Sequence, residues 1–483
     1  RDLHSFPTRR SSDLRGISLM SILGKVFASV LNNRLTQWAN MHDKITECQA
    51  GFRKSYCTSD HIFTIYAIIQ KCLSKRKCKL YVAFVDFKKA FDSVDRSKLW
   101  FCLRNAGLGG KMYAMLTSLY SNIKSCVRSQ DGLSDFFDCP IGLRQGCIMS
   151  PILFSFFINE LYNDISLQGK HGVQLFPDMI EIFLLLFADD VILLSTSIIG
   201  LQNQINILER YSKKCSLTVN LEKTNIVVFR KGGPLSSKEK WFFNTEPISV
   251  LNHYKYLGVK LFYTMNWTHS AADLALRAKR AMLYLMSVYN NVGFLTHNVF
   301  FKLFDVQIQP ILLYGSEIWG YQHFQSLEKI HLLACKKFLG VMQSTPNYGE
   351  CGRFPIYINS QIRCLKYWLK IVHMQDHRLP KISYNMLLHL DNNGKETWAS
   401  HIRNLLCSKG FGVVWLYQSV GNVNAFLNQF KDRSVCMFKQ EWHSRLHDST
   451  RFDLYRQFKS LLEPEKYLSL VITKTLETLI SKI

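Results

Sequence analysis

The sequence lacks any apolar run long enough to cross a bilayer. Its longest runs, such as FLLLF at 183–187, stop at charged residues well short of the roughly 20 apolar residues that a membrane span needs. It also lacks a tandem repeat, a low-complexity tract and any Cys-x-x-Cys spacing. These absences exclude an integral membrane protein and the standard zinc fingers. We therefore expect its 14 cysteines to be reduced thiols in an intracellular compartment.

Acidic residues are scarce relative to basic ones. The 36 Asp and Glu stand against 60 Lys and Arg, which gives a formal net charge of +24 over 483 residues. Such an excess favours a polyanionic partner, because Lys and Arg that neutralise phosphates release condensed counterions. An anionic membrane surface is the weaker alternative, since the basic residues are not gathered on one amphipathic helix. With 47% hydrophobic residues, the chain can fold into about three units.

The hydrophobic pattern predicts an α+β fold. Apolar residues at helical spacing predict helices over 17–38, 59–73, 96–106, 109–122, 150–165 and 200–214, and repeatedly beyond 262. Within the fifth of these, Ser150 is the expected N-cap and Pro151 the first helical residue. Runs of β-branched and aromatic residues predict a strand at 80–87, a hairpin at 182–195, a strand pair at 220–229 and a hairpin at 253–261. Residues 1–14 show no periodicity, and we expect them to be a non-native leader.

Three aspartates interrupt the hydrophobic strands. Asp86 ends the first strand, and Asp189 and Asp190 occupy the turn of the 182–195 hairpin. Each one alone is typical of a turn or a helix cap. Two adjacent carboxylates repel each other, however, and a divalent cation relieves that repulsion. Because no His or Cys lies nearby, the oxygen ligands favour Mg²⁺, and two such ions about 3.5–4 Å apart catalyse displacement at phosphorus. These residues alone leave nuclease action and nucleotidyl transfer both open.

Five sequence motifs occur in order along the chain. They are FVDFKKAFDSVDR, GLRQGCIMSP, FADD, NLEKT and YKYLGV, and each stands on the expected strand, loop or helix. Together they resemble the reverse transcriptase of non-LTR (LINE-type) retrotransposons, over essentially the whole chain from Arg15 onward. The resemblance implies that the sequence is a partial chain of such a protein.

The family resemblance also implies a right-hand polymerase. Residues 15–79 would form fingers and an N-terminal extension. Residues 80–262 would form a palm with an antiparallel sheet, together with remaining fingers elements and a primer-grip hairpin. Residues 263–345 would be a helical thumb, and 346–483 a helical C-terminal region of unknown role.

Catalytic roles follow from the same resemblance. Asp86, Asp189 and Asp190 match the carboxylates that hold two Mg²⁺ ions, for which Mn²⁺ is a substitute. Lys223 of NLEKT matches a residue that protonates the leaving pyrophosphate, and its alternative is an ordinary surface lysine. Asp92 is expected to orient its neighbours by hydrogen bonding rather than to bind metal.

Nucleotide and primer contacts are implied as well. Phe91 falls where the family keeps an aromatic gate against a 2′-OH, although core packing explains it equally well. Gln145 and Gly146 of LRQG match nucleotide-binding positions. Arg53 is assigned to the nucleotide as well, with an ordinary exposed basic residue as its alternative. Arg144 would either hold template phosphate or be a solvated loop residue, and we expect the latter. The primer grip is assigned to four residues of the 253–261 hairpin: Tyr254, Tyr256, Leu257 and Gly258.

The function implied is RNA-directed DNA polymerisation, in which deoxynucleotides are added to a primer 3′-OH by two-metal nucleotidyl transfer. Its partners would be an RNA template, a DNA primer or target DNA and dNTPs, with no membrane and no required protein partner. The expected location is a cytoplasmic ribonucleoprotein, the nucleus or both. Two alternatives remain: a catalytically silent nucleic-acid-binding remnant of such an element, and a related polymerase such as an intron maturase or an RNA-dependent RNA polymerase.

Overall fold

The computed structural model describes two compact units. The described residues are 16–130, 132–168, 171–177, 181–292, 295–341, 347–448, 453–459 and 461–469. The expected leader, 1–14, therefore lies outside them. The first unit comprises Arg1–His61, Cys78–Val228 and Gly233–Leu251, and the second comprises Ile62–Lys77, Phe229–Gly232 and Asn252–Ile483.

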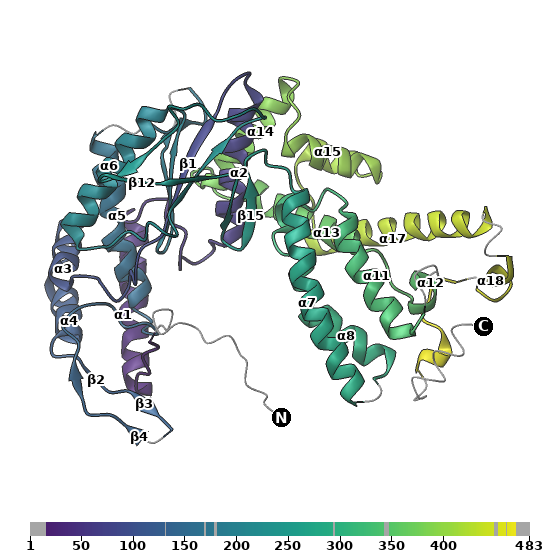
Figure 1. Ribbon diagram of the computed structural model, residues 1–483, viewed down its shortest axis with the longest axis horizontal. Coiled ribbons are helices and arrows are strands. Elements are labelled where there is room, and N and C mark those ends of the chain that lie inside the picture. The colour runs from purple at the N-terminus through teal and green to yellow at the C-terminus, as the bar shows by residue number, and fades with distance from the viewer. Residues whose placement is uncertain are drawn as a thin grey trace. The chain divides into compact units, whose positions relative to one another are not determined.

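A five-stranded sheet is the centre of the first unit (Figure 1). In spatial order its strands are β13 (Ser249–Leu251), β10 (Asn225–Phe229), β1 (Leu80–Val85), β9 (Asp190–Ser195) and β8 (Leu184–Phe187). All six residues of β1 are buried, which is typical of a central strand covered on both faces. The β1–β9 and β8–β9 pairs are antiparallel, as predicted, but β10 and β13 pair in parallel.

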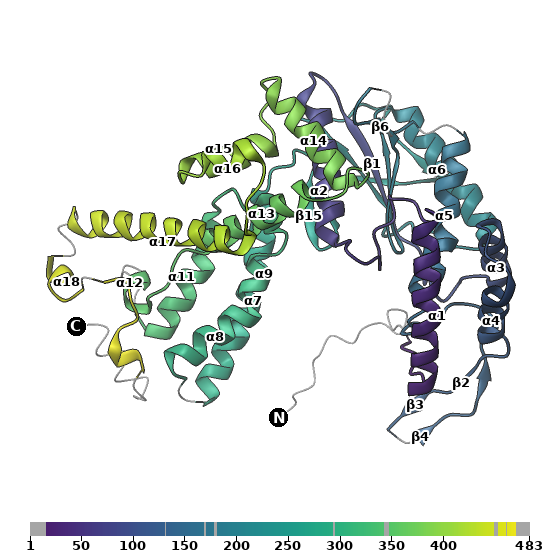
Figure 2. The same cartoon turned by 180° about the vertical axis from the view of Figure 1, so that it is seen from behind.

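Five helices belong to the first unit: α1 (Ile22–Met41), α3 (Arg96–Asn105), α4 (Gly110–Tyr120), α5 (Ser150–Gln168) and α6 (Ile198–Cys215). Helix α6 contacts β1 and β9, α5 packs on α6, and α3 packs on α5 (Figures 1 and 2). Capping fixes the start of α6, because the Ser197 side chain accepts a hydrogen bond from the Gly200 amide. Seven buried hydrophobic residues of α5 join the core that covers the sheet.

Short strand pairs complete the first unit. They are β2 (Lys124–Ser125) with β5 (Phe137–Asp138), β3 (Arg128–Ser129) with β4 (Gly132–Leu133), β6 (Val173–Gln174) with β7 (Glu181–Ile182), and β11 (Phe242–Phe243) with β12 (Glu246–Pro247).

The second unit is mainly helical, as the sequence predicts beyond residue 262. It opens with most of α2 (Thr58–Ser74) and the hairpin of β14 (His253–Tyr256) and β15 (Val259–Phe262). Its other described elements are α7 (Thr268–Val292), α8 (His297–Gln307), α9 (Gln309–Leu312), α10 (Ser316–Trp319), α11 (Gln325–Leu339), α12 (Asn347–Cys351), α13 (Ile356–Val372), α14 (Leu379–Asn392), α15 (Trp398–Ser408), α16 (Gly412–Tyr417), α17 (Val423–His447), α18 (Asp453–Phe458) and a 3₁₀ helix at Lys466–Ser469.

Aromatic residues form the core of the second unit. Trp319, Trp368 and Trp398 are almost completely buried, and the Trp398 indole donates a hydrogen bond to the Ile318 carbonyl at 2.7 Å. Phe63 of α2 meets the Trp398 ring edge-on at 4.8 Å. This contact explains why most of α2 belongs to the second unit although it is encoded early in the chain. Across the described residues, no helix combines the length and the hydrophobicity that crossing a bilayer requires.

Candidate active site

Asp86 lies directly after β1 and is held by the turn at 220–224. Its amide donates a hydrogen bond to Thr224 Oγ1 at 3.2 Å, and its carbonyl accepts one from the Asn220 amide at 2.7 Å. The Asn220 side-chain amide donates to Asp86 Oδ2 at 3.0 Å. The carboxylate is therefore oriented by a side chain from a distant part of the sequence. Sequence reasoning missed Asn220 and Thr224, although both lie in the NLEKT motif.

The strand register brings Asp86 and Asp190 together. β1 and β9 are antiparallel, and the pair nearest the acidic residues joins Val85 to Val191. Asp86 directly follows Val85 and Asp190 directly precedes Val191, so the two aspartates lie at the same end of this strand pair. Two of the three predicted catalytic carboxylates thus converge at one end of the sheet.

Asp189 lies in the two-residue turn of the β8–β9 hairpin. Phe187 pairs with Asp190 across the hairpin, so Ala188 and Asp189 form the connection. Ala188 has φ 57°, the positive value that tight hairpin turns require. Hereafter we call Ala188–Asp190 the acidic turn. It presents adjacent carboxylates at the point where the sequence predicts them.

The donor chemistry of this end of the sheet fits a hard cation. Carboxylate oxygens from neighbouring strands are the ligands that Mg²⁺ prefers. Among the described residues, no group of three or more His, Cys, Asp or Glu side chains is arranged to hold a metal ion. The strands therefore bring acidic residues to one end of the sheet, but the described residues do not form a group of three carboxylates around a metal position. Metal binding by Asp86, Asp189 and Asp190 stays a prediction.

The LRQG loop is fastened to the segment after Asp86. The Leu143 amide donates to the Phe91 carbonyl at 2.7 Å, and the Gln145 side chain donates to Asp92 Oδ1 at 3.1 Å. Asp92 therefore orients a neighbour by hydrogen bonding, as expected. Gly142, at φ 87°, allows this approach, because a Cβ there would come within 2.6 Å of the Asp92 carbonyl oxygen.

Phe91 is half-buried and rigidly packed. Its ring stacks on Phe154 with centroids 4.5 Å apart and planes 19° apart, and Phe52 meets it edge-on at 6.4 Å. The ring contributes to the core, and its remaining exposure leaves the gate role as a prediction. Gly146, at φ 102°, is exposed and lies against the backbone of Ser18, whose amide donates to the Gln145 carbonyl at 2.7 Å.

Arg144 is not the solvated residue that we expected from the sequence. Its guanidinium donates to the Leu119 carbonyl at 2.9 Å and lies over the Tyr120 ring at 5.5 Å. Arg96 donates to the carbonyls of Gly142 at 2.9 Å and Ile141 at 3.2 Å, and it also reaches Tyr120. Arg96 thus supplies donors to the carbonyls of two residues at the start of the loop, and Arg144 ties the loop to the end of α4.

Arg53 is oriented within its own loop. Its Nη1 donates to the carbonyls of Thr46 at 3.0 Å and Gln49 at 3.1 Å, and the guanidinium lies 4.2 Å from the Tyr56 ring centroid. Lys223 differs, because its side chain is exposed on the turn that holds Asp86. The nucleotide-binding role of Arg53 and the proton-donor role of Lys223 stay predictions.

The predicted primer-grip hairpin lies in the second unit. Tyr256 is only 2% exposed, so that ring packs in the core, whereas Tyr254 is half-buried. Tyr314 donates to the Leu257 carbonyl at 2.7 Å, and a Cβ at Gly258 would come within 2.8 Å of the Tyr314 ring. The turn at Leu257 and Gly258 is thus held from within the unit, and its role toward a primer remains a prediction.

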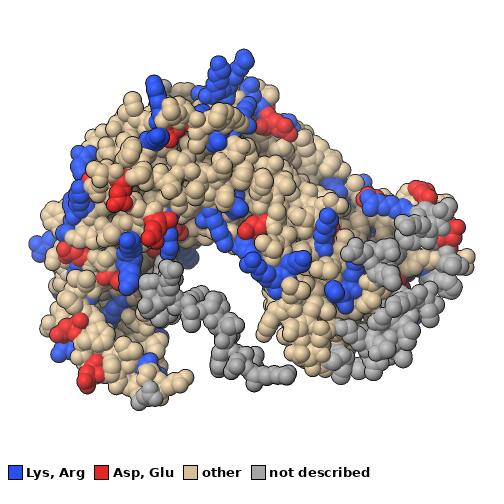
Figure 3. All heavy atoms as spheres, in the orientation of Figure 1, with Lys and Arg blue, Asp and Glu red and all other residues tan. Residues whose placement is uncertain are grey.

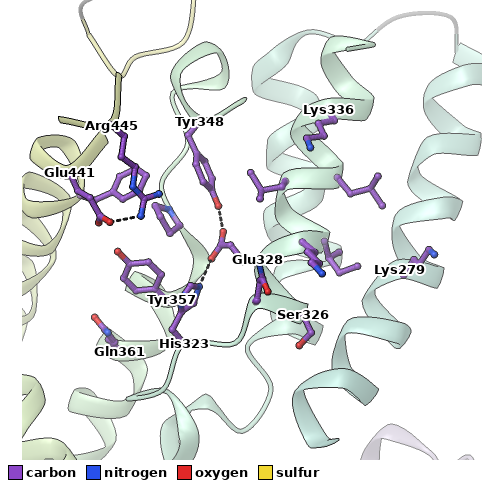
Figure 4. Close-up of a pocket in the computed structure, with 17 residues that line it drawn as sticks. Lys279, His323, Ser326, Glu328, Lys336, Tyr348, Tyr357, Gln361, Glu441 and Arg445 are labelled. Atoms are coloured by element: carbon purple, nitrogen blue, oxygen red, sulfur yellow. Dashed lines mark hydrogen bonds and ion pairs between the residues drawn. The ribbon is translucent and has the colours of Figure 1, made fainter. Parts of the chain in front are cut away.

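A cavity of about 1030 Å³ also lies in the second unit (Figure 4). None of the predicted site residues lines it. At its wall Glu328 accepts hydrogen bonds from Tyr348, the Ile356 amide and His331. Burial alone would raise the pKa of Glu328, but these donors, His331 first, outweigh it and lower the pKa below the usual value. Because internal partners already satisfy Glu328, the carboxylate serves the packing of α11, α12 and α13.

Basic side chains are scattered over the face of the molecule that Figure 3 shows, with fewer Asp and Glu among them. This distribution fits the net charge of +24 and a partner that is bound through many phosphates.

An acidic turn between two antiparallel strands, and a glycine-flanked loop fastened to the segment after Asp86, are the arrangement that the sequence motifs predict for a polymerase. The reverse transcriptase (RNA-dependent DNA polymerase) family matches residues 7–261, more than half of the chain. The chain belongs to the reverse transcriptase family. The predicted α+β polymerase class, with its helical C-terminal region, is thereby confirmed.

The relatives that the chain matches are non-LTR elements, the group that its motifs resemble. It is 24% identical over 334 residues to the RNA-directed DNA polymerase from mobile element jockey of Drosophila funebris, covering 67% of this chain and 35% of that protein. It is 26% identical over 253 residues to the Pol polyprotein of the R2 element of Nasonia vitripennis, covering 51% of this chain and 24% of that protein. The chain thus spans about a third or less of these relatives.

Among solved structures, the chain is similar to telomerase from Candida albicans in complex with a fragment of telomeric RNA. That likeness has a TM-score of 0.36 and 11% identity, and it covers 75% of this chain and 58% of that chain. Telomerase from Candida tropicalis, in a like complex, gives a TM-score of 0.34 and 14% identity, with 76% and 57% covered.

Proposed function

We propose that this chain is the catalytic part of a reverse transcriptase of a LINE-type element. It adds deoxynucleotides to a primer 3′-OH on an RNA template. The observation that carries the proposal is the strand register that brings Asp86 and Asp190 to the same end of the β1–β9 pair, beside a turn that also carries Asp189. Family membership and the non-LTR relatives support the same activity.

The three aspartates are the proposed ligands of two Mg²⁺ ions, with Mn²⁺ as a substitute. When bound, such ions lower the pKa of the primer hydroxyl and neutralise the charge of the leaving pyrophosphate. Asn220 restrains the Asp86 carboxylate through its 3.0 Å hydrogen bond. Lys223, which is exposed on the same turn, is the proposed donor of a proton to the departing pyrophosphate.

Selection of the incoming nucleotide is proposed for the LRQG loop and Phe91. Gln145, held by Asp92, and Gly146 would line the nucleotide, and Arg53 would neutralise its phosphates. Phe91 cannot easily swing away, because it stacks on Phe154. A fixed ring under the sugar would exclude a 2′-OH and thereby select dNTPs.

Partners follow from the charge and the chemistry. An RNA template and a DNA primer or target DNA would be bound through their phosphates by the basic surface, with Tyr254, Tyr256, Leu257 and Gly258 proposed as the primer grip. No membrane and no further protein partner is invoked. The proposed location is a cytoplasmic ribonucleoprotein or the nucleus, where the template and the target occur.

Primer extension by the purified chain tests the proposal. With Mg²⁺, an RNA template and a DNA primer, we expect extension with dNTPs and far less with rNTPs. Asp86→Ala and Asp189→Ala should each lower the rate by about 10³-fold or more, because charge neutralisation at phosphorus is lost. RNA binding should persist in both variants. Asp138→Ala, which removes an exposed carboxylate of the same unit, is the matched control.

Two outcomes would overturn this function. If the wild-type chain binds RNA but extends no primer with Mg²⁺ or Mn²⁺, it is a silent nucleic-acid-binding remnant. If it prefers rNTPs, it is a related RNA polymerase instead. Full activity in Asp189→Ala would overturn the assignment of the acidic turn.

A further inference from the structure

A buried glutamine from the QAGF segment reaches the acidic turn. Gln49 is 0% exposed, and its side-chain carbonyl oxygen Oε1 accepts a hydrogen bond from the Ala188 amide at 3.1 Å. The same oxygen accepts a second one from the Gly51 amide at 2.8 Å. One atom therefore links a residue of the acidic turn to a segment 139 residues earlier in the chain.

The backbone on either side of Gln49 is fastened to β8. The Leu186 amide donates to the Cys48 carbonyl at 2.9 Å, and the Ala50 amide donates to the Leu186 carbonyl at 3.0 Å. Gly51 then lies so close to the turn that a Cβ would come within 2.3 Å of the Ala188 nitrogen. The backbone and one side chain of Cys48–Gly51 therefore contact both β8 and the acidic turn.

The acidic turn needs such support. Ala188 has φ 57°, a conformation that non-glycine residues adopt only when their surroundings enforce it. Two contacts hold Ala188 in this conformation. Its amide donates a hydrogen bond to Gln49, and Gly51 lies close against it. The conformation of Ala188 in turn decides where Asp189 and Asp190 project.

We propose that Gln49 is a positioning residue of the reverse transcriptase reaction, which fixes the acidic turn through the Ala188 amide so that Asp189 and Asp190 hold their metal-binding geometry. The inference rests on the proposed function. In this role Gln49 acts only through the turn.

A contribution to folding stability alone does not explain why a glutamine occupies position 49. Its Nε2 is buried and has no hydrogen-bond partner among the described residues, and a buried donor without a partner is unfavourable. Methionine has nearly the same shape and would avoid that cost, but it could not accept the Ala188 hydrogen bond. The acceptor is therefore the property of Gln49 that the site uses.

The test compares two buried glutamines that both contact this sheet. Gln49→Met removes the acceptor at the turn. Gln204→Met is the control, because Gln204 is also 0% exposed and donates to the Leu194 carbonyl at the far end of β9, at 2.9 Å. Gln49→Glu is the rescue variant, since burial favours its protonated form, whose carbonyl oxygen still accepts. Each is assayed for primer extension, RNA binding, thermal melting and Mn²⁺ binding by electron paramagnetic resonance.

We expect Gln49→Met to weaken Mn²⁺ binding and to lower kcat by about 10–100-fold, the usual effect of losing a group that orients metal ligands. RNA binding and the KM for dNTPs should change little, the melting temperature should fall no more than in Gln204→Met, and Gln49→Glu should recover most of the loss. Equal Mn²⁺ affinity and equal kcat in the two methionine variants overturns the inference.

The Mn²⁺ measurement separates this inference from the proposed function. If the wild-type chain extends no primer, the polymerase proposal fails, yet a loss of Mn²⁺ affinity confined to Gln49→Met still supports positioning of the turn. If the wild-type chain binds no Mn²⁺, the inference itself is overturned.

Discussion

At the scale of single residues, the candidate site depends on side chains that hold the acidic ones. Asn220 reaches Asp86 across 134 residues of sequence, and Thr224 receives the Asp86 amide. Neither residue carries chemistry of its own. Their contribution is to restrict one carboxylate to a single orientation before any substrate arrives, which lowers the entropy cost of assembling the reacting groups.

Asn220→Ala tests this restriction. The variant leaves Asp86 Oδ2 without its side-chain donor, so we expect kcat to fall by roughly 10-fold or more. Stability should fall by only about 1–2 kcal/mol, the cost of one buried hydrogen bond. Asn225→Ala is the control, because Asn225 donates to the Lys223 carbonyl and not to Asp86. Primer extension and urea unfolding measure the two effects, and equal kcat losses in both variants would contradict the role of Asn220.

The site residues that could be predicted have a local signal in the sequence, and those that could not be predicted have none. Asp86, Asp189 and Asp190 are recognisable locally, because acids interrupt hydrophobic strands. The roles of Asn220 and Gln49 depend on partners more than a hundred residues away. Arg144 was expected to be solvated for the same reason, since nothing near it in the sequence indicates the Leu119 carbonyl that it binds.

At the scale of elements, most helices and strands follow from hydrophobic spacing. The helix predicted over 200–214 is α6, and the hairpin predicted at 182–195 contains β8 and β9. The strand pair predicted at 220–229 is wrong in its first half. There the Thr224 amide donates to the Asn220 carbonyl, and the backbone forms a turn before β10 begins. This turn contacts an aspartate that is distant in the sequence, and its own residues show no hydrophobic pattern from which the turn could be predicted.

The start of α5 shows a smaller difference. Ser150 was predicted to be the N-cap, but it is the first helical residue, and its hydroxyl donates to the Arg144 carbonyl at 2.7 Å. The parallel pairing of β10 with β13 was also not predictable, because strand direction at a sheet edge depends on the path of the intervening chain.

The prediction at the scale of elements concerns Arg96, the first residue of α3. It donates to the carbonyls of Tyr120, Ile141 and Gly142 and so ties α3 to the end of α4 and to the LRQG loop. Arg96→Met should cost about 2–3 kcal/mol of stability, because charged donors are lost from several carbonyls. We expect the KM for dNTPs to rise by about 3–10-fold, because the LRQG loop becomes less well held.

Arg104→Met is the matched control, since Arg104 is exposed on the same helix and contacts the Tyr113 ring. Urea unfolding and steady-state kinetics on an RNA template measure both quantities. An unchanged KM in a well-folded Arg96→Met variant would show that the loop keeps its geometry without this tie.

At the scale of the whole molecule, the compact units cut across the functional regions implied by the family. Residues 15–79 were assigned together as fingers, yet Ile62–Lys77 is grouped with the second unit. The cause is packing, because Phe63 lies between the rings of Tyr367 and Trp398. Amphipathic spacing predicted α2 but not its neighbours. The fingers, palm and thumb boundaries stay predictions.

Net charge gives the prediction that belongs to this scale. A chain with a charge of +24 should bind RNA largely through phosphates. If it contacts about 6–10 phosphates, affinity should fall by about 10³–10⁵-fold between roughly 50 and 200 mM salt. Fluorescence anisotropy with a labelled RNA measures this slope, and a melting curve at each salt concentration is the control. A nearly flat slope would mean that few phosphates are contacted.

The contact between Gln49 and Ala188 also has a consequence for biosynthesis. Residues 48–51 leave the ribosome long before the hairpin on which they pack, and the edge strand β13 follows only at 249–251. The nascent chain must therefore keep an unpaired, apolar β1 in solution, or shielded by a chaperone, until its neighbours in the sheet have been translated.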